Sequence, residues 1–570
     1  MGNIQTSAPN LEEAFKKDGH TVIQHVTHGK GFGIKAQAVT GNYIGYVRGS
    51  PYEMGFMMGR MFYSELEKTC TTYLTHMVPQ FISEDFDVAM QTAPLILSII
   101  YENILKWLIN ILVTESVTAF DDSVKKGDIP AHFVEEIDGM IAGASSMRAF
   151  SHVTRARIIA ANFGLDYLFS QILSGRIFTR LKKFLSQFPK LPIDSKKILA
   201  VPEMCNLVMV SKSATLSKND AYMMRDFQFA NGRVYHKNCM ILIRDGRDHN
   251  RLLNACVTMP GWIGAITGLN QSGLACGMNM IRSEAVDTER IGCGIMIMNR
   301  SVLDTCKSLD EMETHVRSMV IGMPWILYGL DANGDQRVFE LVGRNIPLDP
   351  EHWKDRYDNP KELIASFKLD AKWNTGSNGV WPRTGFHHEH GDRELSEMNR
   401  KLFKSIKLPN PEFPLFKTFS DEYENPLGHS YFVLWHPQPD VTIATNSFLN
   451  PILRRTEMTP RMRALNTGTP STTWRYGKLA TMVENYHGKI TLSECRTIVS
   501  FLNPKDEPKY SSNERKYNQY AQMVGSRYDD NEAIMISGSL SVIDINARRL
   551  ENKSGNWQNE FFGITLTNYE

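Results

Sequence analysis

This sequence has almost no net charge, no closely spaced cysteine pair and no serine-hydrolase motif. Its 570 residues carry a net charge of +1, which supplies no basic surface of the kind that nucleic acids bind, so we expect no nucleic-acid partner. The eight cysteines include no CxxC pair, which argues against a zinc ribbon and a disulfide scaffold and suits a reducing compartment. No GxSxG occurs, which disfavours a serine-triad hydrolase.

Long uninterrupted apolar runs are also missing. Residues 95–113 are strongly apolar, but Glu102, Lys106 and Asn110 recur along one side of the expected helix. A bilayer-spanning helix needs about 20 apolar residues, so we expect a buried or membrane-facing amphipathic helix instead. Residues 177–197 mix basic with apolar side chains. Such a segment either lies on anionic lipid or is a solvated helix face, which leaves peripheral membrane contact open.

The N-terminal residues lack the pattern of a secretory signal peptide. Residues 1–10 are polar and no apolar core follows them, so we expect a cytoplasmic protein. Gly2 fits the N-myristoylation pattern, whereas a plain flexible terminus explains the same residues. One myristoyl chain alone would hold a membrane only marginally. A homo-oligomer is a further open alternative.

The most informative stretch is a predicted hairpin that begins at Cys205. Cys205 opens the apolar run 207–210, polar residues 211–220 form a turn, and a second strand carries Arg225 and Asp226. The hairpin would bring Arg225 near Cys205, and a cation beside a thiol favours the thiolate. The alternative is that Cys205 is a small buried apolar residue, as most free cysteines are.

Other stretches predict ordinary elements. Ser50-Pro51 marks the start of a helix on which Gly55 and Gly59 share one face and permit close packing. Further strands are expected at 239–243, 252–257 and 441–446, with a final strand at 538–544, and a helix at 309–319. Residues 325–342 predict a hairpin with an Asn-Gly turn.

A polar insertion is expected at about 344–428, which is rich in Pro and Asn and has little periodicity. It contains the cluster His387-His388-Glu389-His390. This cluster has the ligand chemistry of a metal site, but no second ligand group follows at a defined spacing. We therefore interpret it as a solvated loop.

These motifs resemble, in order, those of N-terminal-nucleophile (Ntn) hydrolases of the acyl-coenzyme A:6-aminopenicillanate acyltransferase and choloylglycine hydrolase clan, with phospholipase B-like proteins as more distant relatives. The matching positions are Gly49 to Gly59, Cys205, Arg225, Asn270, Asn279, Asn446 and Arg475. The resemblance implies an α+β fold, a four-layer αββα sandwich of two antiparallel sheets. It also implies a mainly helical N-terminal region at 1–204, which would be either a propeptide or a subunit. The catalytic core would then be residues 205–570.

The resemblance further implies a set of site residues. Cys205 would be the nucleophile, Arg225 would hold the thiolate, and Asn279 and Asn446 would contact the reacting carbonyl. Substrate contacts would come from Asp226, Gln228, Asn270 and Arg475, with Gln228 standing where bile-salt members have Asp. Autocatalytic cleavage would occur between Met204 and Cys205. No metal or cofactor is expected.

The function implied is cleavage of a carbon–nitrogen amide bond, or transfer of its acyl group, with a small lipophilic acyl amide or acyl ester as substrate. Two alternatives belong to other classes. One is a phospholipase B-like lipid acyl hydrolase, which the apolar N-terminal helices and the lipidation pattern favour. The other is a catalytically inactive, membrane-associated interaction protein, in which Cys205 would be unprocessed and unreactive.

Overall fold

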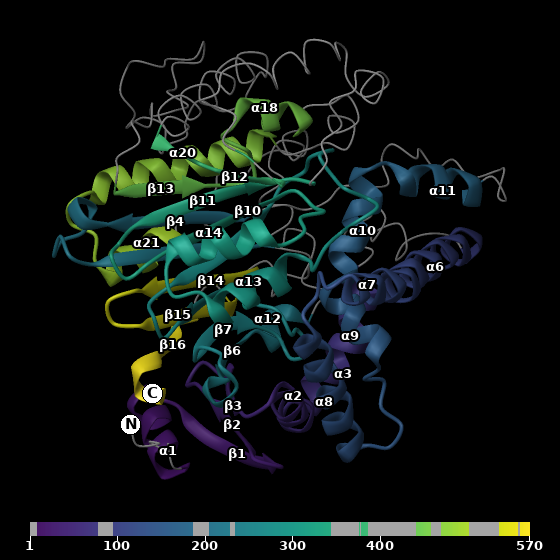
Figure 1. The fold of residues 1–570 in the computed structure, drawn as a ribbon, viewed down its shortest axis with the longest axis horizontal. Coiled ribbons are helices and arrows are strands. Elements are labelled where there is room, and N and C mark those ends of the chain that lie inside the picture. The colour runs from purple at the N-terminus through teal and green to yellow at the C-terminus, as the bar shows by residue number, and fades with distance from the viewer. Residues whose placement is uncertain are drawn as a thin grey trace.

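The fold consists of two β-sheets packed face to face, with helices outside them (Figure 1). The computed structural model describes residues 8–77, 95–185, 205–228, 234–343, 376, 378–385, 440–457, 469–500, 535–556 and 559–570. Gly2, Met204, the histidine cluster at 387–390 and nearly all of the predicted insertion lie outside these residues. The predicted α+β class is confirmed.

The larger sheet has ten strands in the order β1-β2-β3-β6-β7-β8-β9-β10-β11-β12. Neighbouring strands are antiparallel except for β3 and β6, which are parallel. The expectation of two purely antiparallel sheets is therefore wrong at this one pair. Parallel strands need a long crossover connection, and the chain between β3 and β6 supplies one, which contains the N-terminal helices and the hairpin at 206–227 of the other sheet. The strands are β1 (Thr21–His28), β2 (Gly31–Gln37), β3 (Tyr43–Arg48), β6 (Met240–Asp245), β7 (Asn254–Thr258), β8 (Thr267–Asn270), β9 (Ala275–Met280), β10 (Trp325–Leu330), β11 (Gln336–Leu341) and β12 (Val380–Pro382).

The smaller sheet is antiparallel throughout, in the order β13-β4-β5-β14-β15-β16. Its strands are β13 (Val441–Ala444), β4 (Asn206–Ser211), β5 (Ala221–Phe227), β14 (Met535–Asp544), β15 (Arg549–Asn556) and β16 (Phe562–Thr565). The predicted hairpin after Cys205 is confirmed as β4 and β5. The prediction that β14 ends the sheet is wrong, because β15 and β16 follow. Most of β15 is polar and lacks an alternating apolar pattern, and backbone hydrogen bonds place it between two neighbours.

Alternating side chains of the smaller sheet face two different layers. Val208 and Val210 pack outward against helices α20 (Thr469–Tyr486) and α21 (Leu492–Ser500). Leu207 and Met209 point inward and join the main core between the sheets. Helices α13 (Ile295–Thr305) and α14 (Leu309–Ser318) cover the outer face of the larger sheet. The layers therefore follow the predicted αββα order.

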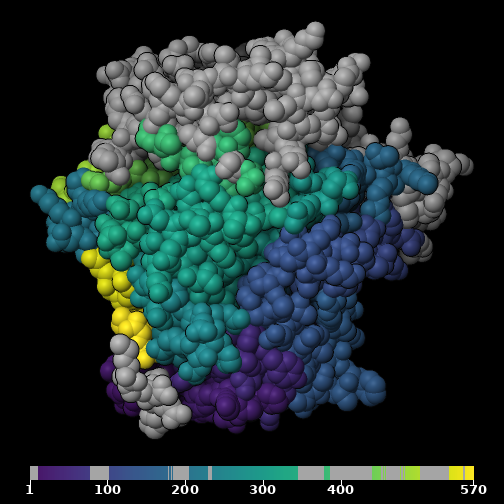
Figure 2. All heavy atoms as spheres, in the orientation of Figure 1, coloured from purple at the N-terminus to yellow at the C-terminus, as the bar shows by residue number. Residues whose placement is uncertain are grey.

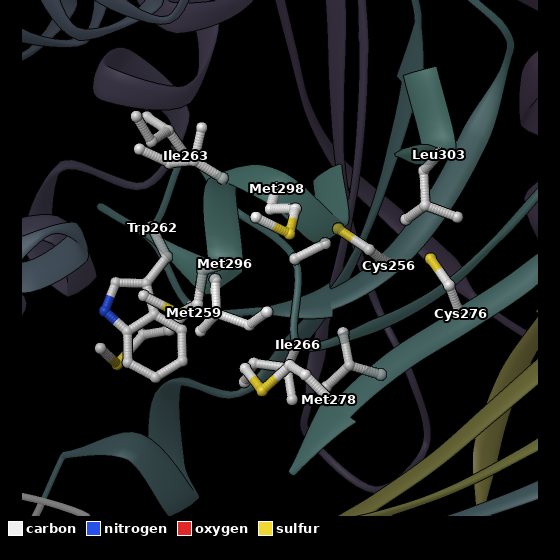
Figure 3. Packing of buried hydrophobic residues seen from close by; sticks show 14 of the residues in the cluster. Cys256, Met259, Trp262, Ile263, Ile266, Cys276, Met278, Met296, Met298 and Leu303 are labelled. Carbon is white, nitrogen blue, oxygen red and sulfur yellow. The ribbon is translucent and has the colours of Figure 1, made fainter. Parts of the chain in front are cut away.

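Close packing of α13 onto the larger sheet depends on one glycine. Gly268 lies in a cross-strand row between Cys256 and Cys276. A Cβ at Gly268 would come within 2.5 Å of the Leu303 side chain on α13. Figure 3 shows Leu303 beside the two cysteines, with Met296 and Met298 of the same helix further along the row. The missing side chain at Gly268 lets the helix approach the sheet.

The chain before Cys205 supplies part of the core as well as a helical layer. Strands β1 to β3 extend the larger sheet, and the helices of residues 95–185 gather on one side of both sheets (Figures 1 and 2). These helices are α6 (Leu95–Asn110), α7 (Ser116–Lys125), α8 (Ala131–Met147), α9 (Arg155–Asn162), α10 (Gly164–Leu173) and α11 (Arg176–Leu185), preceded in the chain by α1 (Ala8–Lys17), α2 (Pro51–Met61) and α3 (Tyr63–Lys68). Within the described residues, no helix has both the length and the apolar content needed to cross a bilayer.

A buried charge network ties this N-terminal region to the core. Glu136 on α8 lies 3.5 Å from Arg244 on β6 and 3.6 Å from Arg300 on α13. Arg300 also pairs with Asp304 at 2.7 Å. All four side chains are almost fully buried. Removing one partner from such a network is costly because it leaves an uncompensated charge away from water.

Helices α2 and α8 cross at very short range because glycines meet backbone on both sides. The predicted start of α2 is confirmed, with Ser50 as its N-cap. The shared face of Gly55 and Gly59 is confirmed as well, since a Cβ at these positions would lie 2.0 Å from the Glu136 carbonyl oxygen and 2.1 Å from that of Met140. Backbone atoms cannot move aside as a flexible side chain can.

We predict that Gly59→Ala lowers the free energy of unfolding by about 3 kcal/mol, at the upper end of overpacking effects. The added methyl group would collide with the Met140 carbonyl, so the two helices must separate. Chemical denaturation followed by circular dichroism measures the change. Gly385→Ala is the control, because a Cβ there meets no atom within 4 Å. Equal stability of the two variants would contradict the close contact.

Candidate active site

Cys205 lies immediately before β4, and its backbone is held on both sides. Its N–H donates to Asn446 Oδ1 at 2.9 Å, and its carbonyl oxygen accepts from Arg475 Nη1 at 3.0 Å. The residue is 2% exposed. Its Sγ lies 3.9 Å from the carbonyl oxygen of Gln228, at the end of the paired strand β5. The peptide unit that precedes β4 is thus fixed by segments from distant parts of the chain.

Asn446 and Arg475 form one hydrogen-bonded unit around this backbone. Asn446 Oδ1 accepts from Arg475 Nη2 at 3.0 Å as well as from the Cys205 nitrogen, and Asn446 Nδ2 donates to the Met280 carbonyl at 2.8 Å. Arg475 Nη1 also donates to Asn206 Oδ1 at 2.5 Å. Arg475 is fully buried. The structure therefore places Arg475 against the backbone of Cys205, whereas the sequence suggested a substrate contact.

Arg225 lies beside the thiol, as the hairpin predicts. In the β4–β5 register it pairs with Leu207, so Cys205 is a diagonal neighbour on the same face. Its guanidinium donates to the backbone carbonyls of Asp226 and, at 2.5 Å, Met278, which joins the two sheets. Burial alone lowers the pKa of Arg225, but the nearby ionisable groups of Cys205, Tyr328 and Asp226 outweigh burial and raise that pKa.

Asp226 and Gln228 belong to the network behind the nucleophile. Asp226 accepts hydrogen bonds at 2.7 Å from Gln228 Nε2 and from Asn206 Nδ2. Burial raises the pKa of Asp226 to about 6, although these two hydrogen bonds and the nearby Arg225 and Arg475 oppose the rise. Because Asn206 also binds Arg475, it connects the carboxylate to the unit that holds Cys205.

Asn279 lies across from the nucleophile on β9 of the larger sheet. Its amide donates to the carbonyls of Ala444 at 3.2 Å and Thr445 at 3.1 Å, directly before Asn446. Its Oδ1 accepts from the hydroxyl of Tyr328 at 3.3 Å. The structure thus brings Asn279 to the site. Both hydrogens of its amide are engaged with backbone in this state of the chain.

Asn270 is the predicted site residue that the structure places elsewhere. It lies at the turn end of the β8–β9 hairpin, whereas Asn279 lies at the far end of β9. Its Oδ1 accepts from two backbone nitrogens of the turn, and its Nδ2 donates to the carbonyls of Leu303 and Cys306. These bonds stabilise a turn against α13. Among the described residues, no hydrogen bond joins Asn270 to the group around Cys205.

Two residues of the site were not singled out from the sequence. Asn206 carries a detectable pattern, because it is a polar residue at the start of an otherwise apolar strand. Tyr328 has no such pattern, since it sits in an apolar strand far along the chain. Gly277 makes room for it, because a Cβ there would lie 2.7 Å from the Tyr328 ring. Only the pairing of β9 with β10 reveals this neighbour.

Among the described residues, metal-ligand groups do not gather near Cys205. Across the ranges that the structure describes, no three His, Cys, Asp or Glu side chains form a group that could hold a metal ion. The eight cysteines are all buried and none forms a disulfide. The described residues therefore offer thiol, guanidinium and amide chemistry at this site.

Sequence comparison confirms the resemblance over part of the chain. The family model for acyl-coenzyme A:6-aminopenicillanic acid acyl-transferase matches residues 217–349. This range contains Arg225, Asp226, Gln228 and Asn279, and it excludes Cys205 and the later site residues. An uncharacterized protein from Archaeoglobus fulgidus is 24% identical over 344 residues, which cover 58% of this chain and 49% of that protein. The match thus spans about half the length of this relative.

Solved structures of low overall similarity come from two enzymes. Two variants of a conjugated bile acid hydrolase from Clostridium perfringens are 11% and 12% identical, each with a TM-score of 0.32 over 64% of this chain and 92% or 93% of the hydrolase. A penicillin V acylase from Agrobacterium tumefaciens is 13% identical, with a TM-score of 0.30 over 64% of this chain and 86% of the acylase. With TM-scores this low, the fold assignment depends on the layers and strand order described above.

The raised pKa of Asp226 gives stability a defined pH dependence. The carboxyl ionises less readily in the folded chain, so the stability that it contributes is present below about pH 4 and is lost as the pH rises through about 6. We expect Asp226→Asn to gain roughly 3 kcal/mol of unfolding free energy relative to the parent between pH 4 and pH 7. Urea titrations of the parent and the variant across this pH range measure the difference.

Asp138→Asn is the control for this experiment, because Asp138 is exposed on α8. Its stability difference from the parent should stay constant across the same pH range. A pH-independent difference for Asp226→Asn would show that Asp226 does not titrate as its burial implies.

Proposed function

We propose that this chain is an Ntn-type amide hydrolase or acyltransferase with Cys205 as its nucleophile. One observation supports this most directly. The backbone nitrogen and carbonyl of Cys205 are held by Asn446 and Arg475, while Arg225 lies beside its thiol. The two backbone contacts would be needed by any residue buried at this position, whereas a cation beside the thiol is the contact that favours a thiolate. The family match adds independent support for acyl-transfer or amide-hydrolysis chemistry.

Maturation is proposed to begin at the bond between Met204 and Cys205. The thiol attacks the Met204 carbonyl carbon, and the carbon–nitrogen bond breaks as the carbon–sulfur bond forms, giving a thioester. The thiol proton passes to the departing nitrogen, so this step frees the α-amine of Cys205. Water then hydrolyses the thioester, which leaves a carboxylate on Met204 and restores the thiol of Cys205. Asn446 Oδ1 already accepts a hydrogen bond from the nitrogen that becomes this amine.

Turnover would then use the same groups on a substrate. The α-amine, with an ordinary pKa near 8, takes the thiol proton, and the thiolate attacks the acyl carbonyl. The amine leaving group departs with that proton and leaves an acyl-thioester on Cys205. Water completes hydrolysis, whereas a second amine would complete acyl transfer. Arg225 favours the thiolate by its charge.

Oxyanion stabilisation is proposed for Asn279 together with a backbone N–H. One such donor contributes roughly 3 kcal/mol of transition-state stabilisation. In the uncleaved chain the Asn279 amide donates to the carbonyls of Ala444 and Thr445. This role therefore requires the amide to exchange at least one backbone carbonyl for the developing oxyanion when a substrate is bound.

We propose a small lipophilic acyl amide or ester as the substrate, handled without a metal or cofactor. We also propose, from the sequence, a cytoplasmic location and self-association. The same sequence patterns lead us to propose N-myristoylation of Gly2 and contact with a membrane surface. Activity on a glycerophospholipid and not on a fatty-acyl amide would instead identify a phospholipase B-like lipid hydrolase. An inactive chain would keep an intact, alkylation-resistant Cys205.

Self-cleavage before Cys205 would divide the chain into two fragments. Purified wild type should consist of two associated chains of roughly 23 and 42 kDa, scaled by length from 64.8 kDa. The larger chain should begin Cys-Asn-Leu-Val. We expect Cys205→Ala to remain a single chain with unchanged secondary structure, and Cys205→Ser to cleave slowly because a hydroxyl is the weaker nucleophile. Intact mass and N-terminal sequencing provide the readout.

The association of the fragments has its own structural basis. Strands β1 to β3 and Glu136 belong to the N-terminal fragment but complete the sheet and charge network of the core. Cleavage that persists in Cys205→Ala would instead indicate an external protease. An active but uncleaved wild type would mean that a side-chain base serves Cys205.

The second prediction concerns Arg225. Replacing it with Gln should slow iodoacetamide alkylation of Cys205 at pH 7 by roughly tenfold, because the neighbouring cation is lost. Peptide mapping distinguishes Cys205 from the other buried cysteines. Arg225→Lys keeps the charge but not the planar fork, so recovery in this variant would show that charge dominates. An unchanged rate in Arg225→Gln would remove Arg225 from the site.

A further inference from the structure

The position of Asn446 is not set by a strand. Strand β13 ends at Ala444, and Asn446 belongs to an irregular segment, residues 445–450, that leads to the short helix α18 (Pro451–Arg454). Asn446 nevertheless holds the Cys205 nitrogen at 2.9 Å. Without regular structure, side chains from elsewhere must fix this segment.

Glu340 on β11 fixes the far end of the segment. One carboxylate oxygen accepts from the Leu449 nitrogen at 2.5 Å, and the other accepts from the Asn450 nitrogen at 3.1 Å. Such charge-assisted bonds to backbone N–H groups are stronger than neutral ones. Glu340 belongs to the larger sheet, whereas the segment continues from the smaller sheet. The contact therefore joins the two sheets close to Cys205.

Arg383 completes the contact. Its Nε donates to Glu340 Oε1 at 2.8 Å, and its Nη2 donates to the Ser447 carbonyl at 3.3 Å. Both side chains of the ion pair are 1% exposed. A buried carboxylate and a buried guanidinium thus form hydrogen bonds with the backbone of the residues that follow Asn446. We refer to Glu340 and Arg383 as the Glu340–Arg383 clamp.

The opposite side of the segment is held by its own continuation. Glu457 accepts from the Phe448 nitrogen at 2.7 Å and from the Ser447 hydroxyl at 2.9 Å. Arg454 donates to the carbonyls of Phe448 at 2.8 Å and Leu449 at 2.6 Å. These contacts are local in sequence, so they shape the segment. The clamp attaches the later part of the segment to β11 of the larger sheet, whereas the amides of Asn279 and Asn446 attach its first residues to β9.

We propose that Glu340 and Arg383 are positioning residues, which fix Asn446 and through it the nitrogen of Cys205. This inference rests on the proposed function, in which that nitrogen is first the leaving group of self-cleavage and then the α-amine base. Neither side chain touches the thiol. Asn446 is also bonded to Met280 and Arg475, so loosening the clamp would remove one of its restraints and make the acceptor of the Cys205 nitrogen less firmly placed.

Hydrogen exchange in a Cys205→Ala background tests the positioning independently of any chemistry. We expect Glu340→Gln to increase exchange at least tenfold in peptides covering residues 205–211 and 446–450, and to leave β15 unchanged. Glu551→Gln is the matched control, because Glu551 is a buried carboxylate bonded to Arg496 and Arg549 at 2.7 and 2.6 Å. Unchanged exchange around residue 205 in Glu340→Gln would overturn the inference.

Self-cleavage with Cys205 intact tests the consequence. In a cell-free synthesis pulse followed by a chase, Glu340→Gln should cleave at least tenfold more slowly than wild type, and Glu551→Gln at the wild-type rate. Arg383→Lys keeps the charge and should retain more than half of the rate, whereas Arg383→Met should not. Thermal melting of both Arg383 variants is measured in parallel. If the two melt at similar temperatures but cleave at different rates, the difference in rate comes from positioning and not from a general loss of stability.

The two experiments distinguish failure of the proposed self-cleavage from failure of the proposed positioning role of Glu340 and Arg383. An uncleaved wild type with normal exchange effects of Glu340→Gln would overturn the proposed maturation and leave the clamp intact. A wild type that cleaves, together with Glu340→Gln that cleaves equally fast or a Glu551→Gln that slows equally, would overturn the clamp and leave the nucleophile assignment intact.

Discussion

Two guanidinium groups without access to water constrain the centre of this molecule. The Nη1 and Nη2 groups of buried Arg225 donate to backbone carbonyls of β5 and β9, and those of Arg475 donate to Cys205, Asn206 and Asn446. A buried donor left without a partner is expensive. The two sheets and α20 must therefore meet in one arrangement, and that arrangement places polar groups around a cysteine.

The N-terminal 200 residues are bound to this arrangement by more than their helices. Parallel pairing of β3 with β6 puts three N-terminal strands into the larger sheet, and Glu136 compensates two buried arginines of the core. Loss of this region would expose a sheet edge at β6 and would leave buried Arg244 without its carboxylate partner. Cleavage before Cys205 would thus give two chains sharing one core.

Amide side chains serve as structural links across the sheets near Cys205. Asn279 donates to the backbone just before Asn446, and Asn446 donates to the backbone just after Asn279. This reciprocal pair closes the gap between the sheets at the level of the thiol. The same residues are proposed to act on a substrate, so catalysis and sheet packing would compete for the same donors.

The sequence by itself determined the local features: the β4–β5 hairpin with Arg225 near Cys205, the glycine face of α2, and the order of the motifs. The hairpin and the glycine face follow from residues close together in the chain, where alternation, caps and turn residues act directly, whereas the order of the motifs is read along the whole sequence. Tertiary structure alone decided the parallel β3–β6 pair, the separation of Asn270 from Asn279, and the roles of Tyr328 and Glu340. These features depend on which distant strands become neighbours. Burial and backbone hydrogen bonding over the whole core select that strand order, and no local sequence pattern specifies it.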